Sequence, residues 1–189
     1  MTTVETRIEM PASDLDSREA RFITFLKQLI TDPGQMANLR RGLGKPPGSV
    51  AAMHPIILPF LTAADHANDP WDEDRFYLIA SLFAFWHQGK SGSTTIEPAN
   101  LGASLALLAH HSDSIEQRFV ALLNCYRDDL PQHLRHSVGL LKSHDVGISW
   151  RQLLVDLKGW NWESRSVQRE WARGFWRRLG PEDVIAEEN

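Results

Sequence analysis

Apolar residues recur every three or four positions along most of the chain, which is the spacing that gathers them on one face of an α-helix. No segment alternates apolar and polar residues over the length of a strand. The sequence therefore predicts an all-α fold of about eight to nine helices. Their approximate bounds are 18–30, 33–41, 50–63, 72–86, 101–110, 115–127, 131–142, 150–158 and 165–179.

Several helix ends carry side chains that favour a start or a stop. A hydroxyl or carboxylate before the first turn accepts hydrogen bonds from free backbone amides, and proline suits the first turn. Glycine favours a helix end, whereas proline inside an apolar segment kinks or breaks it. The predicted starts are Ser17, Pro33, Asp72, Ser114 with Gln117, Pro131, and Ser149 with Gln152; the predicted stops are Gly42 and Gly89, and the predicted breaks are Pro55 and Pro59.

A polar, glycine-containing segment, Gly89 to Pro98, divides the chain near its middle and has the composition of a linker. We therefore predict two packed helical bundles. Residues 1–90 form the N-terminal bundle, residues 99–180 form a C-terminal bundle with a basic face, and residues 181–189 form an acidic tail.

The composition is that of a folded protein in a reducing cytoplasm. Hydrophobic residues make up 42% of the chain, which is enough for a core, yet no apolar run reaches the 18 residues of a membrane helix. The single cysteine, Cys125, has no partner in the chain for a disulfide and falls in an apolar helical pattern. We expect a cytoplasmic protein without a membrane anchor.

The formal net charge of −4 conceals a basic second half. Residues 1–20 hold five acids against two bases, and residues 181–189 hold four acids and no base. Between Ser114 and Gly180, by contrast, eleven Lys and Arg face seven Asp and Glu. A basic region of this kind is compatible with nucleic-acid binding, although a solvated helix face shows the same excess.

No motif in the chain predicts an enzyme, a metal site or a cofactor. The segment Gly89-Lys90-Ser91 resembles the end of a phosphate-binding loop, but Ala84 stands where the first glycine belongs and the preceding pattern is helical. The pair His110-His111 lies at a helix end, which favours histidine without any metal, and has no ligand spacing around it. Cys125 lacks a histidine partner for nucleophilic chemistry.

Tryptophans are concentrated in the second half of the chain. Exposed aromatic rings can stack on unpaired bases, but Trp171 and Phe175 lie four residues apart on one helical face, which is core spacing. We therefore predict that the tryptophans fill the core rather than bind bases. The residues concerned are Trp150, Trp160, Trp162, Trp171 and Trp176.

Arginines are regularly spaced on the predicted helices of the second half. Arg165, Arg169 and Arg173 lie four residues apart, so they align in a stripe that could follow a phosphate backbone. An ordinary solvated face, with Glu163 and Glu170 as ion-pair partners, gives the same pattern. Spacing alone leaves both interpretations open.

Five segments together resemble one known family. They are Asn38–Gly42 (Asn-Leu-Arg-Arg-Gly), Ser114–Leu123, Asp129–Ser143, Ile148–Leu157 and Gln168–Phe175. Their order and spacing are similar to those of the CasB family, the small subunit of the type I-E CRISPR surveillance complex Cascade. The resemblance spans about residues 20 to 178.

The resemblance implies an all-helical, non-catalytic subunit without cofactors. Two head-to-tail copies would lie along the complex among the other Cascade subunits. They would hold the crRNA–target DNA assembly and the displaced single strand, and so stabilise the R-loop. A helical scaffold that binds only protein, with its arginines in ion pairs, is the alternative interpretation.

The basic residues at the matching positions are the candidate nucleic-acid contacts that the resemblance implies. The early Leu-Arg-Arg element, the Glu-Gln-Arg-Phe segment and the His-Leu-Arg segment contribute the first four, and the last three match less closely. These residues are Arg40, Arg41, Arg118 and Arg135, followed by Lys90, Arg127 and Lys142.

Overall fold

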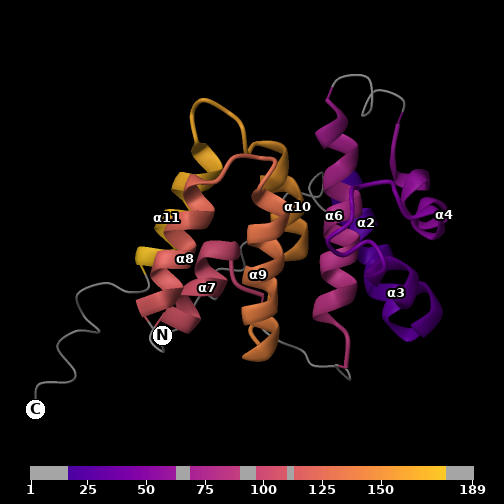
Figure 1. Ribbon diagram of the computed structural model, residues 1–189, viewed down its shortest axis with the longest axis horizontal. Coiled ribbons are helices and arrows are strands. Elements are labelled where there is room, and N and C mark those ends of the chain that lie inside the picture. The colour runs from indigo at the N-terminus through magenta and orange to yellow at the C-terminus, as the bar shows by residue number, and fades with distance from the viewer. Residues whose placement is uncertain (1–16, 63–68, 90–96, 110–112, 178–189) are drawn as a thin grey trace, which may run out of the picture.

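The computed structural model describes residues 17–62, 69–89, 97–109 and 113–177, and helices are the regular elements found there. The all-α prediction is confirmed (Figure 1). The α-helices are α2 (Arg18–Gln28), α3 (Pro33–Arg40), α4 (His54–Ile57), α6 (Pro70–Trp86), α7 (Leu101–Ala109), α8 (Asp113–Asn124), α9 (Leu130–Ser143), α10 (Trp150–Lys158) and α11 (Ser166–Trp176). Three short 3-10 turns, η1 (Leu29–Thr31), η2 (Ala51–Met53) and η3 (Leu58–Phe60), extend α2 and flank α4.

Three predicted helix starts are confirmed by the local contacts. Helix α3 begins at Pro33, where the preceding Asp32 carboxylate accepts hydrogen bonds from the Gly34 and Gln35 amides at 3.0 Å. The Ser17 hydroxyl caps α2 by accepting a hydrogen bond from the Ala20 amide at 3.2 Å. Pro131 lies in the first turn of α9, where its missing amide proton costs no helical hydrogen bond. The proline-containing segment 50–63 is broken as expected, with the single turn of α4 between η2 and η3.

Two predicted starts are wrong. Helix α6 begins at Pro70 rather than Asp72, because the Asp69 carboxylate accepts from the Trp71 amide. Helix α8 begins at Asp113, so Ser114 lies inside the helix. The start of α10 at Trp150, directly after Ser149, is as predicted, but the Ser149 side chain makes no capping hydrogen bond.

Helix α6 occupies the centre of the fold, because it is apolar on nearly its whole circumference and must be covered on several sides. Helix α3 packs on one side of it, and α9 and α10 pack on others. In Figure 1, α6 stands between α3 and α4 on one flank and α9 and α10 on the other.

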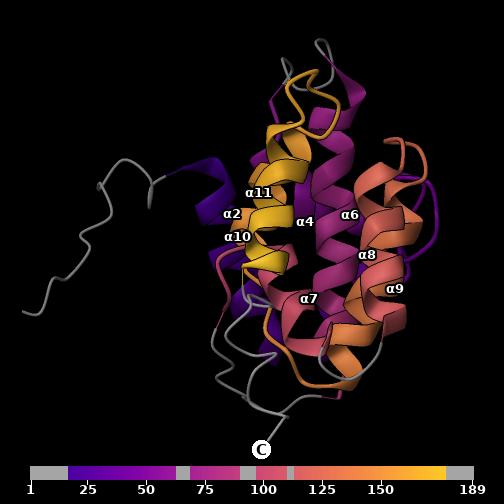
Figure 2. The same ribbon diagram turned by 90° about the vertical axis from the view of Figure 1, so that its left-hand side faces the viewer.

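The helices of the second half pack partly on the first half. Helix α10 contacts both α6 and α2, while α7 packs against α11, α8 and α9. Figure 2 shows α8 and α9 side by side. The boundaries 1–90 and 99–180 remain a prediction, but α10 joins the two predicted bundles through one continuous apolar core.

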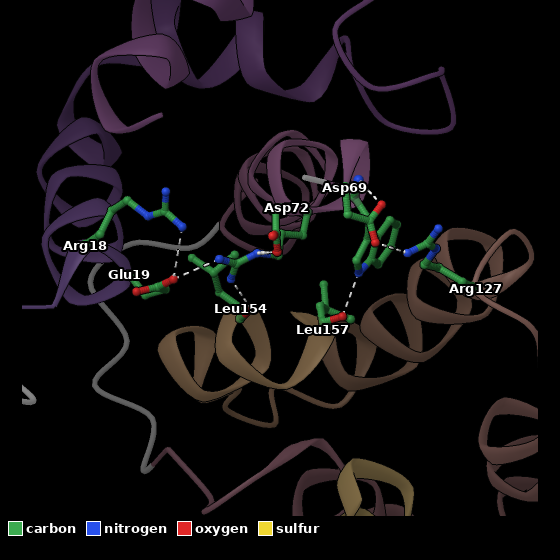
Figure 3. Close-up of polar contacts among 9 residues, drawn as sticks. Arg18, Glu19, Asp69, Asp72, Arg127, Leu154 and Leu157 are labelled. Carbon is green, nitrogen blue, oxygen red and sulfur yellow. Dashed lines mark hydrogen bonds and ion pairs between the residues drawn. The ribbon is translucent and has the colours of Figure 1, made fainter. Parts of the chain in front are cut away.

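Arg75 makes the central polar contact between the two halves (Figure 3). Its side chain is completely buried in α6. One guanidinium nitrogen donates to the Leu154 carbonyl of α10 and another to the Glu19 carboxylate of α2, both at 2.8 Å. Asp72 lies 3.8 Å from its Nε. One side chain thus connects α2, α6 and α10.

The Glu19 carboxylate responds to this contact. Burial raises its pKa, but the hydrogen bond and the charge of Arg75, with a smaller contribution from Arg18, outweigh burial and bring the pKa below its usual value of 4.5. Glu19 therefore stays ionised beside the buried guanidinium.

The tryptophan prediction is confirmed for Trp150, Trp160 and Trp171, whose side chains are almost fully buried. It is wrong for Trp162 and Trp176, which are 56% and 37% exposed. Buried indole N–H groups need acceptors, and Trp171 donates to the Asp156 carboxylate at 2.7 Å. This bond joins α11 to α10.

Helices α7 and α11 approach so closely that only glycine fits between them. A Cβ atom on Gly102 would lie 2.0 Å from the Trp171 carbonyl oxygen, which is backbone and has no freedom to move aside. The α7–α11 contact therefore depends on the missing side chain at position 102.

We expect Glu19→Ala to lower the free energy of unfolding by about 3 kcal/mol, because it leaves the buried charge of Arg75 without its nearest counter-ion. Chemical denaturation measures the loss. Glu97→Ala is the matched control, because it removes an acid from the Lys27 pair, which is largely exposed and contributes less than about 1 kcal/mol. Equal losses for the two variants would contradict the role of Arg75.

We expect the stability difference between wild type and Glu19→Gln to depend on pH. Because folding lowers the pKa of Glu19, its carboxylate stabilises the fold above about pH 4.5. That contribution is lost as the pH falls through the lowered folded-state pKa. Urea titrations between pH 7 and pH 3 should show the two proteins converging in acid; a constant difference would contradict the prediction.

Candidate nucleic-acid interface

The site is built around the loop 42–48, which leaves α3 and lies beside α9 (Figure 2, purple loop). Gly44 and Gly48 have φ angles of +74° and +71°, a conformation that glycine adopts without strain. The Lys45 amide donates to the Gly42 carbonyl at 3.1 Å, which closes a tight turn. The sequence Gly-Leu-Gly-Lys-Pro-Pro-Gly thus presents Lys45 on a short, defined loop.

Arg135 projects from α9 to this loop. A Cβ atom on Gly44 would lie only 2.7 Å from the Arg135 Nη1, so the guanidinium rests directly against the glycine backbone. Arg135 is exposed, and no hydrogen bond or ion pair within the described part of the chain engages it. Lys45 is likewise exposed, and its side chain has no hydrogen bond or ion pair with the described residues.

Arg40 and Arg41 end α3 immediately before the loop. Arg40 is half-buried, whereas Arg41 is exposed and donates to the Asn38 side chain at 3.2 Å. An exposed, weakly held guanidinium retains donors for a phosphate. The structure therefore brings two predicted elements, Leu-Arg-Arg and His-Leu-Arg, to the same loop from different halves of the sequence.

Arg127 and Lys142 have intramolecular partners. Arg127 forms an ion pair with Asp69 at 2.6 Å and lies 5.6 Å from the centre of the Trp71 ring. The Trp71 amide is the main cause of the lowered pKa of Asp69, which burial opposes and Arg127 reinforces.

The ammonium of Lys142 donates to the Phe85 carbonyl near the end of α6 at 2.8 Å, and it lies 4.6 Å from the centre of the Phe85 ring. Both Lys142 and Arg127 therefore hold C-terminal elements against α6.

Arg118 lies on the exposed face of α8 and makes no side-chain hydrogen bond or ion pair with the residues that the structure describes. It belongs to a different helix from Arg135, and no contact connects the two. Lys90 lies outside the described residues.

The arginine stripe of α11 forms contacts within the chain. Arg165, with a φ angle of +48°, donates to the Leu123 carbonyl; Arg169 donates to the Ser164 carbonyl, and Arg173 pairs with Glu170. These contacts favour the interpretation as a solvated helix face that spacing alone left open.

Two features of the site were missed at the sequence level. Lys45 is not among the candidates that the sequence predicts, because its closeness to Arg135 depends on tertiary packing. Tyr126, in the turn between α8 and α9, is 82% exposed and was not singled out as a candidate. Its position directly before Arg127 was the available signal, since an aromatic beside a base is typical of single-strand binding.

No cluster of three or more His, Cys, Asp or Glu suited to a metal occurs in the residues that the structure describes. Within the same residues, every helix lacks the length or the apolar character that a membrane span requires. Cys125 is half-buried; burial, reinforced by the nearby Asp129 charge, raises the pKa of its thiol to about 11. A thiol so rarely ionised is a poor nucleophile.

A comparison with family models matches residues 35–176 to "CRISPR-associated protein Cse2". The chain belongs to the Cse2 family. A Cse2 protein of Thermus thermophilus is 35% identical over 162 residues, covering 82% of this chain and 88% of the relative.

Solved structures agree with this assignment. CasB of M. ruber, at 35% identity, superposes with a TM-score of 0.73 over 90% of this Cse2 chain and 98% of its own. A chain of a CRISPR RNA-guided surveillance complex, at 28% identity, gives 0.71 over the same shares of the two chains. The resemblance to CasB inferred from the sequence is thus confirmed.

We expect Cys125 to react with iodoacetamide at pH 8 roughly 100-fold more slowly in the folded protein than in urea, because a pKa two units higher leaves about a hundredth of the thiolate. Mass spectrometry over time measures the rate. The urea-unfolded chain is the control for the intrinsic reactivity of the thiol. Similar rates in the two states would show that the fold neither buries the thiol nor raises its pKa.

Proposed function

We propose that this chain is a non-catalytic subunit of a CRISPR RNA-guided surveillance complex and that it holds a nucleic-acid strand by its phosphates. The observation that carries the proposal is the convergence of Arg41, Lys45 and Arg135 on one loop. All three are exposed, and of the three only Arg41 forms a side-chain hydrogen bond within the described part of the chain. Arg118 provides a separate cation on α8.

Phosphate contacts suit the task of such a subunit. Opening a duplex against a guide RNA exchanges one set of base pairs for another of similar stability, so protein contacts to the backbones decide the balance. The guide reads the sequence, and the protein needs only sequence-independent cations to stabilise the displaced strand and the crRNA–target DNA assembly.

The partners follow from the same proposal. The surveillance-complex relatives support contacts to other subunits of such a complex. We propose in addition that a second copy of this chain lies beside it in the assembly. The scaffold alternative keeps a specific observation in its favour, because Arg127 and Lys142 already hold the fold together and are less available to phosphates.

We expect Arg41→Ala, Lys45→Ala and Arg135→Ala each to weaken binding to a single-stranded oligonucleotide and to reduce its salt dependence. Each lost phosphate contact lowers the magnitude of the slope of log Kd against log salt by roughly 0.7, so the triple variant loses about two. Fluorescence anisotropy between 50 and 300 mM salt measures the slopes.

Lys27→Ala is the matched control, because it removes one exposed cation from α2 and should leave the slope unchanged. The proposal is wrong if wild type shows no salt-sensitive binding at 50 mM salt. Incorporation of the triple variant into the complex, with normal R-loop formation there, would favour the protein scaffold.

A further inference from the structure

A cavity of about 480 Å³ opens beside the basic loop, between α6, α9 and residues 42–48. Its walls are largely apolar, with Met53, Leu78 and Leu82 contributing aliphatic carbon and Trp71 and Tyr77 contributing aromatic carbon. Ligand pockets in proteins commonly measure 300–1,000 Å³ on this scale, so it has room for a group as large as a nucleotide.

The polar atoms of the cavity lie at a few defined positions. Ser81 donates its hydroxyl proton to the Leu78 carbonyl at 2.9 Å, which leaves the hydroxyl oxygen able to accept. Asp128 and Gln132, at the start of α9, add a carboxylate and an amide. Tyr77 is already engaged, with its hydroxyl 2.8 Å from His54 Nδ1. The lining therefore offers acceptors and one amide donor around an apolar centre.

Cations occupy one part of the same lining. Lys45 and Arg135 both border the cavity, and His136 lies beside Arg135. The Arg135 guanidinium lies against Gly44, at the edge of the cavity. An anion bound by Lys45 and Arg135 would therefore adjoin the apolar interior.

This combination selects a ligand with a flat, largely apolar ring, hydrogen-bonding groups on its edge and an attached anion. A free phosphate would use the two cations alone and leave the apolar walls unfilled. An aliphatic side chain would fill the walls but leave the cations and Asp128 without partners. A nucleobase attached to its backbone phosphates uses all three parts of the cavity.

We propose that the cavity receives one unstacked base of a bound single strand, while Lys45 and Arg135 hold the phosphates that flank it. The inference rests on the proposed function, because the cations that bind the strand also border the cavity. Binding a base in this way resists sliding of the strand without reading its sequence, since every base has an apolar face.

The test compares two twelve-nucleotide strands bound by the wild-type protein. One strand is abasic throughout, and the other carries a single central 2-aminopurine in an otherwise abasic strand, so that no other base can substitute. We expect the single base to tighten binding roughly 5- to 100-fold, the range of base–aromatic stacking. We also expect the bound 2-aminopurine fluorescence to be shielded from dissolved acrylamide.

Two variants narrow the cavity from α6, Leu78→Phe and Ser81→Leu, and thermal melting verifies that each is folded. We expect both to lose the gain from the single base and to keep the affinity of wild type for the abasic strand. Leu107→Phe is the size-matched control on the exposed side of α7 and should retain the gain.

Each alternative outcome has its own meaning. Equal, salt-sensitive affinities for the two wild-type complexes would overturn the base site and leave the phosphate-binding function standing. Absence of binding to either strand would overturn the proposed function itself. A gain that persists in the narrowed variants would place the base elsewhere, for example on Tyr126. Narrowed variants that keep the gain but fail to join the complex would make the cavity a protein-binding site.

Discussion

The arrangement of the helices depends on one fully buried guanidinium. Arg75 is fully buried in α6, so its donors find acceptors only inside the fold. Two guanidinium nitrogens donate to α10 and α2, while Nε has no hydrogen-bond partner among the described residues and lies 3.8 Å from the Asp72 carboxylate. Such a contact adds little net stability compared with an apolar substitute, but it penalises every packing that leaves the charge unpaired. It fixes α10 against α6, and the Trp71 indole, which donates to the Leu157 carbonyl at 2.6 Å, fixes the same pair one helical turn further along.

Two further polar contacts with α6 position the basic site. The α8–α9 turn is held to the start of α6 by Arg127 and Asp69, and the far end of α9 is held to the end of α6 by Lys142. Helix α9 is thereby fixed at both ends along α6. Its exposed Arg135 then meets the glycine loop that follows α3. Arg127 and Lys142, two of the predicted nucleic-acid contacts, thus fix the position of the helix that carries a third, Arg135.

Local sequence patterns predict where the helices lie, but they do not predict which helices pack against one another. The predicted helix 150–158 has the bounds of α10, because its apolar spacing is strong and Gly159 follows it. Periodicity identifies the apolar face but not which helix covers it, so the packing of α10 on α6 and α2 was not foreseen. The same limit applies to the site: Arg41 and Arg135 came from family resemblance, but only tertiary structure separates Arg135 from the internally bonded Arg127. The wrongly assigned Trp162 lies outside the helical patterns, where spacing carries no information about burial.

The close approach of α7 and α11 has a consequence for the order in which the protein can be completed during synthesis. Nearly every residue of α7 is buried, and the backbone that fits against Gly102 belongs to α11, the last helix in the described chain. A nascent chain lacking that helix exposes the apolar surface of α7 to the crowded solution, where such surfaces associate. Truncation before α11 therefore does more than shorten the protein. It leaves an aggregation-prone intermediate whose exposed apolar surface only the final helix can cover.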